Sequence, residues 1–223
     1  MSTTAVRDIL ALGPVMPVVV IDRADRAAPL ARALLAGGIR AIEVTMRTPA
    51  ALDAVRSIRD EVPAMAVGAG TILGPADLSA AMRAGSVFGV SPGATRELLQ
   101  AARDGGLPLL PGVMTPSDIL QALAQGYDTL KFFPARPAGG VPMLSAFAGP
   151  FAGVRFCPTG GIDFAGAPAY LALPNVACVG GTWIAPRELI EREDWAAIEA
   201  IAREAARLAR PGPHAAAGHG GSA

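Results

Sequence analysis

The sequence of 223 residues contains little cysteine and little histidine, and it carries no net charge. Its two cysteines, Cys157 and Cys178, form neither a CxxC motif nor a disulfide framework, so we expect a reducing compartment, the cytoplasm. Nineteen basic residues balance nineteen acidic ones, which argues against nucleic acid as a main partner.

Long hydrophobic runs are also absent. The apolar runs, such as residues 15–21, are far too short to span a bilayer, and the N-terminal residues lack the pattern of a signal peptide. We therefore expect no membrane partner. The hydrophobic content of 52% instead indicates a large buried core.

Histidine is missing from most of the chain, since both histidines, His214 and His219, lie near its C-terminal end. Zinc-dependent catalysis usually uses a cluster of histidine ligands, so we predict no metal. The sequence also lacks a GxGxxG motif after a strand, a P-loop and a GxSxG elbow. We therefore predict that the protein needs no cofactor.

What the sequence does contain is a regular alternation of short apolar runs and helical stretches. The runs are almost continuously apolar, as expected for parallel strands that are buried on both faces. Eight such units favour a (β/α)8 TIM barrel, with a doubly wound open sheet as the alternative. The predicted strands lie at 15–21, 39–45, 65–70, 87–91, 107–111, 128–133, 154–158 and 176–180.

Helix boundaries are indicated by capping residues followed by proline. Thr48-Pro49, Gly74-Pro75 and Thr115-Pro116 each predict a helix start. We also expect an extra N-terminal helix at 3–12 and a last helix at about 195–209. Without an internal linker, residues 1–210 are predicted to form a single domain, and the Gly/Ala-rich tail at 211–223 is predicted to be disordered.

One lysine stands among eighteen arginines. Lys131 lies near the C-terminal end of the predicted strand at 128–133, the end at which barrel active sites are built. A simple positive charge at a strand end is the alternative role. However, arginine serves at every other basic position, and only lysine can deprotonate and form an imine. Lys131 is therefore the candidate nucleophile.

Glu43 is the candidate general acid and base, because a carboxylate in a buried strand is costly unless it is paired or functional. A strand-end pair with Arg40 or Arg47 is the alternative. Arg47 itself could hold a carboxylate or phosphate, or it could be an ordinary loop arginine.

Several small residues follow the predicted strands at the same rim. Thr71 ends the run VGAGT, and Pro92 lies in the turn after the fourth strand. Barrels often bind phosphate through glycine-rich loops after their last two strands. The candidate phosphate loops contain Thr159, Gly160 and Gly161 after the seventh strand, and Gly180, Gly181 and Thr182 after the eighth.

These motifs together resemble the 2-keto-3-deoxy-6-phosphogluconate (KDPG) and 4-hydroxy-2-oxoglutarate aldolases. The resemblance runs from about residue 6 to residue 209. Its most specific segments are KFFPA and RFCPTGGI. The full set is EVTMRT (43–48), VGAGTIL (67–73), SPG (91–93), KFFPA (131–135), RFCPTGGI (155–162) and GGTW (180–183).

The resemblance implies a homotrimeric barrel that cleaves KDPG, a phosphorylated 2-keto acid of the Entner–Doudoroff route, to pyruvate and glyceraldehyde 3-phosphate. It also implies activity on 4-hydroxy-2-oxoglutarate. It assigns Lys131 to the Schiff base and Glu43 to proton transfer. The substrate-binding positions that it implies are Arg47, Thr71, Pro92, Thr159, Gly160, Gly161, Gly181 and Thr182.

Three other functions remain open at this point. The same chemistry could act on 2-keto-3-deoxy-6-phosphogalactonate, the C4 epimer. A phosphosugar isomerase or epimerase would use the glycine loops without an imine. A non-catalytic barrel that binds phosphate ligands would need neither Lys131 nor Glu43.

Overall fold

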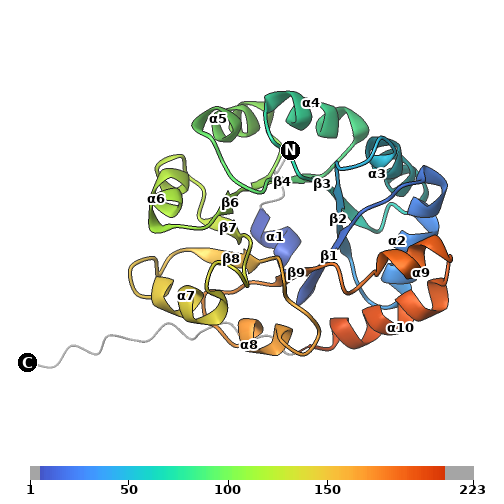
Figure 1. Ribbon diagram of the computed structural model, residues 1–223. Helices are drawn as coiled ribbons and strands as arrows, with labels where there is room; N and C mark the ends of the chain where they lie inside the picture. Colours follow the sequence, from blue (N-terminus) through green and yellow to red (C-terminus); the bar gives the residue numbers. More distant parts are fainter. Residues whose placement is uncertain (1–5, 209–223) are drawn as a thin grey trace, which may run out of the picture.

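The computed structural model describes residues 6–208, and within them all paired strands run parallel (Figure 1). The strands are β1 (Val15–Val19), β2 (Ala41–Thr45), β3 (Ala66–Gly70), β4 (Phe88–Val90), β5 (Leu109–Leu110), β6 (Gly112–Val113), β7 (Thr129–Phe132), β8 (Arg155–Pro158) and β9 (Val179–Gly181). Each overlaps or extends a predicted strand. The predicted strands are therefore confirmed in their approximate positions, except that the fifth is divided in two.

The strands form a curled six-stranded sheet and a three-stranded sheet. The first has the order β5-β4-β3-β2-β1-β9, and the second has the order β6-β7-β8. The division falls at Pro111, which has no N–H to donate to a neighbouring strand. The predicted strand at 107–111 is thus wrong at its C-terminal end, since β6 continues beyond this proline.

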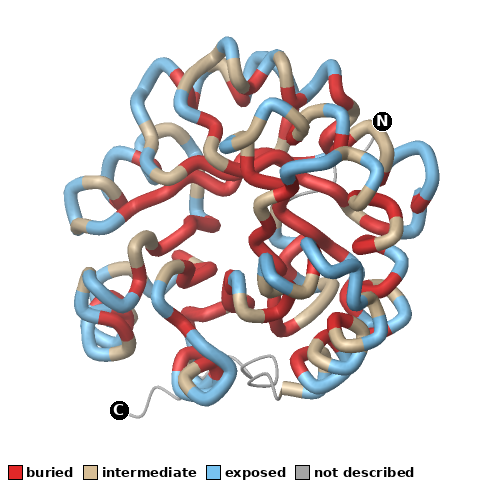
Figure 2. Tube along the Cα trace, turned by 45° about the vertical axis from the view of Figure 1, so that its right-hand side comes forward, coloured by how far each residue is buried: buried red, intermediate tan, exposed pale blue. Residues whose placement is uncertain are grey.

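Helices surround the strands, and their outward faces are exposed while the strands are buried (Figures 1 and 2). The longer helices are α2 (Ala27–Ala36), α3 (Ala51–Glu61), α4 (Pro75–Ala84), α5 (Arg96–Gly105), α6 (Pro116–Ala124), α7 (Gly140–Phe147) and α10 (Trp195–Ala206). The short ones are α1 (Val6–Leu10), η1 (Ala24–Arg26), α8 (Ala167–Leu171) and α9 (Arg187–Glu191).

Two of the three predicted Thr-Pro or Gly-Pro helix starts are confirmed. Helix α4 begins at Pro75, and α6 begins at Pro116 with a capping box between Thr115 and Asp118. The start at Thr48-Pro49 is wrong, because α3 begins at Ala51. The Thr48 hydroxyl donates to the Ile21 carbonyl instead of capping the helix.

The predicted N-terminal helix is present as α1, and it covers one end of the strands (Figure 1). Its buried Ile9 and Leu10 belong to an apolar cluster that includes Met16, Ala41 and Phe88, which lie at or near the N-terminal ends of their strands. The carboxyl ends of the strands lie opposite this cover. Residues 209–210 and the predicted tail at 211–223 lie outside the described residues.

Candidate active site

Lys131 and Glu43 face each other from the two different sheets. Lys131 lies on β7 and Glu43 lies on β2. The Lys131 Nζ donates to Glu43 Oε1 at 3.2 Å and to Oε2 at 3.4 Å. Their side chains are only 6% and 3% exposed. Burial of two charges costs about as much free energy as their attraction returns, so fold stability does not explain this pair. An amine beside a carboxylate can act as a nucleophile with its own acid and base.

Apolar and soft side chains surround the Lys131 amine. Its Nζ lies 5.3 Å from the centre of the ring of Phe133, two residues further along the chain. Cys157 is its partner in register on β8. The Cys178 thiol donates to Cys157 Sγ at 3.4 Å, and this contact lowers the pKa of the Cys157 thiol, with a further contribution from the Lys131 charge. Lys131 therefore has an aromatic ring and a thiol beside the carboxylate of Glu43.

Arg47 and Thr71 meet at the carboxyl ends of β2 and β3. The exposed Arg47 donates from Nε to the Thr71 hydroxyl at 3.3 Å. Thr71 has a φ of 63°, which is a strained conformation for a β-branched residue. Such strain is typical of functional sites, and here it accompanies a hydroxyl that contacts a guanidinium.

The glycine loops adjoin the carboxyl ends of β8 and β9. Thr159 is buried and forms an isolated parallel bridge with Gly180. Gly160 and Gly161 have φ values of 105° and 77°, which favour glycine. Gly181 is buried and Thr182 is exposed, and Pro92 is half-buried in the turn after β4. These positions surround the same end of the strands as Lys131 and Glu43.

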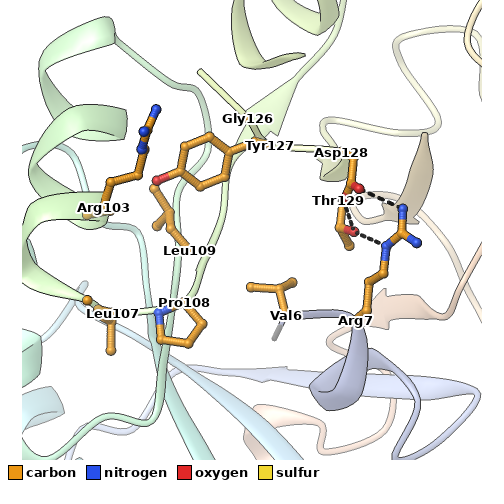
Figure 3. A pocket seen from close by; sticks show the side chains of 12 residues that line it. Val6, Arg7, Arg103, Leu107, Pro108, Leu109, Gly126, Tyr127, Asp128 and Thr129 are labelled. Atoms are coloured by element: carbon orange, nitrogen blue, oxygen red, sulfur yellow. Dashed lines mark hydrogen bonds and ion pairs between the residues drawn. The ribbon is translucent and has the colours of Figure 1, made fainter. Parts of the chain in front are cut away.

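A cavity of about 540 Å³ lies at the other end of the strands (Figure 3). Its lining includes Arg7 of α1, Arg103 of α5 and Thr129, the first residue of β7. Tyr127 borders it and donates from its hydroxyl to the Leu99 carbonyl at 2.8 Å. None of the predicted site residues lines this cavity, so it is separate from the site at Lys131.

Residues 6–208 hold no group of three or more His, Cys, Asp or Glu side chains that could bind a metal ion. Over the same range, no helix has the length and apolar character needed to cross a membrane.

A family model described as KDPG and KHG aldolase matches residues 6–201, which include every candidate site residue. The chain belongs to the KDPG and KHG aldolase family. This match confirms the resemblance to the family that the sequence motifs indicate.

Three members of this aldolase family are similar to the chain in sequence or in structure. The KHG/KDPG aldolase of Escherichia coli K12 is 48% identical over 207 residues, which cover 93% of this chain and 97% of the relative. A KDPG aldolase from Legionella pneumophila, with pyruvate captured as a covalent carbinolamine intermediate, has a TM-score of 0.88 and 46% identity, covering 90% and 97% of the two chains. The KDPG aldolase of Zymomonas mobilis with 3-phosphoglycerate has a TM-score of 0.89 and 45% identity, covering 94% and 98%.

Sequence reasoning on this aldolase overlooked one glycine, Gly70, and did not predict which side chain Gly180 contacts. Gly70 lies against Glu43, and Gly180 lies against the Thr159 hydroxyl. The signal was present in VGAGT, where Gly68 and Gly70 occupy alternate positions and so share one face of the strand. At Gly70 the missing side chain leaves room for a side chain of the protein itself, that of Glu43.

Proposed function

We propose that this member of the KDPG and KHG aldolase family is a metal-independent aldolase that forms a Schiff base on Lys131. It cleaves KDPG to pyruvate and glyceraldehyde 3-phosphate, and it cleaves 4-hydroxy-2-oxoglutarate to pyruvate and glyoxylate. The observation that carries the proposal is the buried contact of 3.2 Å between Lys131 Nζ and Glu43 Oε1. The carbinolamine captured in the Legionella relative supports the same chemistry.

Imine formation begins with a proton transfer from the Lys131 ammonium to the Glu43 carboxylate, along the hydrogen bond that joins them. The neutral amine attacks the C2 ketone, and proton transfer from nitrogen to oxygen gives a carbinolamine. Glu43 then returns its proton to the C2 hydroxyl, which leaves as water. The products of this stage are a cationic imine and an ionised Glu43.

Cleavage uses the cationic imine as an electron sink, so the step needs neither a metal nor a cofactor. Glu43 removes the proton of the C4 hydroxyl, directly or through a water, and the C3–C4 bond breaks. The bonding electrons pass to the imine and leave an enamine, while the aldehyde departs. Glu43 protonates C3 of the enamine, and hydrolysis of the new imine releases pyruvate and regenerates Lys131.

Substrate binding is assigned to the residues around this pair. Arg47, Thr71 and Thr159 hold the pyruvyl carboxylate and the carbinolamine, which keeps the reacting carbons aligned. The support is the contact of 3.3 Å between Arg47 and Thr71 and the burial of Thr159. The Thr159 hydroxyl lies 3.9 Å from Sγ of Cys157, the register partner of Lys131. Pro92 borders the site. The phosphate is held by Gly160, Gly161, Gly181 and Thr182, and the support is their place at the carboxyl ends of β8 and β9.

The architecture that fits this function is a single-domain (β/α)8 barrel over residues 1–210. Two contacts support closure across the ends of the two sheets. The Ala177 N–H donates to the carbonyl of Phe156 on β8 at 2.8 Å, and Thr159 after β8 bridges Gly180 of β9. The homotrimeric assembly and the cytoplasmic location stay predictions.

The test is a pyruvate-release assay on both C4 epimers, each with and without its phosphate. We expect the fastest turnover with KDPG and measurable turnover with 4-hydroxy-2-oxoglutarate. Faster turnover of the galactonate epimer would favour the alternative aldolase. If no substrate released pyruvate and borohydride had no effect on the enzyme, the isomerase or epimerase function would replace the proposal.

A further inference from the structure

Gly70 is the last residue of β3 and lies against the side chain of Glu43. An ideal Cβ at Gly70 would lie 2.1 Å from Glu43 Oε1, 2.6 Å from Cγ and 2.7 Å from Cδ. No left-handed backbone conformation requires glycine here, because Gly70 is not among the described residues with positive φ. A glycine within a strand marks a close approach, and the group that approaches is the proposed acid and base.

The strand register explains how the two residues meet. Glu43 is paired with Gly68 on β3, and Gly70 is paired with Thr45. The Glu43 side chain therefore leans along the sheet toward the carboxyl ends of the strands, across the position where a Gly70 side chain would begin. In this orientation its Oε1 reaches Lys131 Nζ.

We propose that Gly70 is a positioning residue for the aldol reaction, because its missing side chain leaves the space that lets Glu43 reach Lys131. This inference rests on the proposed function of the Lys131–Glu43 pair. Gly70 has no side chain that could take part in the reaction, so it acts only through Glu43.

An added methyl group would displace the carboxylate rather than the strand. The Gly70 carbonyl accepts a hydrogen bond from the Met46 N–H at 2.8 Å, which holds the backbone in place. The atoms that the methyl group would meet belong to the flexible end of Glu43. Gly70→Ala should therefore fold normally while it separates the carboxylate from Lys131.

Gly68 provides a matched control on the same face of the same strand. A Cβ at Gly68 would lie 2.4 Å from two atoms of the buried Phe88 ring, and its three nearest atoms would all belong to that ring rather than to Glu43. The ring has little freedom to move in a packed core. Gly68→Ala should therefore lower the thermal midpoint and leave the kcat of the folded enzyme near that of the wild type.

The test measures kcat, KM and thermal midpoint for the wild type, Gly70→Ala and Gly68→Ala. We expect Gly70→Ala to lower kcat by about 100-fold, with KM within a few-fold, because misplacement by about 1 Å costs that much. The thermal midpoint should fall as well, because the two buried charges lose contact with each other. Borohydride and pyruvate should still label Lys131 in this variant. A wild-type kcat in Gly70→Ala, or a loss of thermal midpoint with an unchanged kcat, would overturn the inference.

A shorter carboxylate at position 43 gives a second measurement. Its result would not change with the residue at position 70 if Gly70 had only a structural role. Aspartate lacks one methylene group, so it fits beside an alanine at position 70 better than glutamate does. Glu43→Asp should lower kcat less in the Gly70→Ala background than in the wild type, a coupling that a double-mutant cycle measures. Equal losses in both backgrounds would contradict the inference. An inactive wild type without labelling of Lys131 would instead reject the proposed function itself.

Discussion

Lys131 and Glu43 lie 3.2 Å apart with side chains 6% and 3% exposed, whereas Arg7 and Asp128 lie 2.8 Å apart with side chains 52% and 54% exposed. Strand β7 links the two pairs, because Arg7 also donates to the hydroxyl of Thr129 on this strand at 3.2 Å (Figure 3). An exposed pair of this kind contributes about 0–1 kcal/mol and tolerates substitution. A buried pair gains little net stability, so its residue types are set by what the two groups do.

Among the variants of the buried pair, Lys131→Arg should have the largest effect on kcat. Arginine keeps the positive charge but cannot form an imine, so we expect kcat to fall by about 10⁴-fold or more. A steady-state pyruvate-release assay measures this, and circular dichroism checks that the variant folds. Activity at even a few per cent of the wild type in the folded variant would refute the nucleophilic role.

Glu43→Gln removes the proton-transfer group and keeps its shape. We expect a fall in kcat of about 10²–10⁴-fold, the usual contribution of a general acid and base. Pyruvate should still label Lys131 with borohydride, but more slowly. A wild-type kcat would show that another group moves the proton.

A variant that lacks both charges of the Lys131–Glu43 pair separates the effect of the pair on stability from its effect on activity. Replacing both Lys131 and Glu43 with methionine should leave the free energy of unfolding unchanged or raise it by about 1–4 kcal/mol, because neither a desolvated charge nor an unpaired polar group remains. The same double variant should be inactive. Denaturant unfolding measures the first quantity, and a large loss of stability would mean that the pair has a structural role.

Thr71 allows a test of strain beside the pair. At its φ of 63°, glycine should make the protein about 1–2 kcal/mol more stable than alanine, because an L side chain is strained in the left-handed region. Both substitutions remove the hydroxyl that contacts Arg47, so both should lower kcat/KM. Equal stabilities of Thr71→Gly and Thr71→Ala would exclude strain at this position.

Arg7→Ala should have the smallest effect. The exposed pair with Asp128 should contribute no more than about 1 kcal/mol, and kcat should stay at the wild-type level. A large loss of activity would mean that the two ends of the strands are coupled, and it would break the contrast between the two pairs.

Much of this fold could be predicted because its strands are continuous apolar runs separated by helices of regular length. The errors arose where a tertiary contact decided the local structure. Thr48 donates to the Ile21 carbonyl, so α3 begins later than its capping pattern indicates. The division at Pro111 depends on how neighbouring strands meet, which apolar periodicity does not describe.

In the candidate site, residue types were easier to predict than contacts. Lys131 was singled out because it is the only lysine, and Glu43 because it interrupts an apolar strand. Their separation of 3.2 Å depends on strands that are 88 positions apart in the sequence. The contact with Gly70 depends on the direction of the Glu43 side chain, so the sequence could indicate a close approach at this rim but not its partner.

Borohydride trapping with pyruvate is the most direct test of the Schiff base. Lys131 carries the only side-chain amine in the sequence, so labelling has one expected position. Peptide mass spectrometry should find the reduced pyruvyl group on Lys131 in the wild type and no such adduct in the Lys131→Arg variant. An unlabelled Lys131 in the folded, active enzyme would contradict the account.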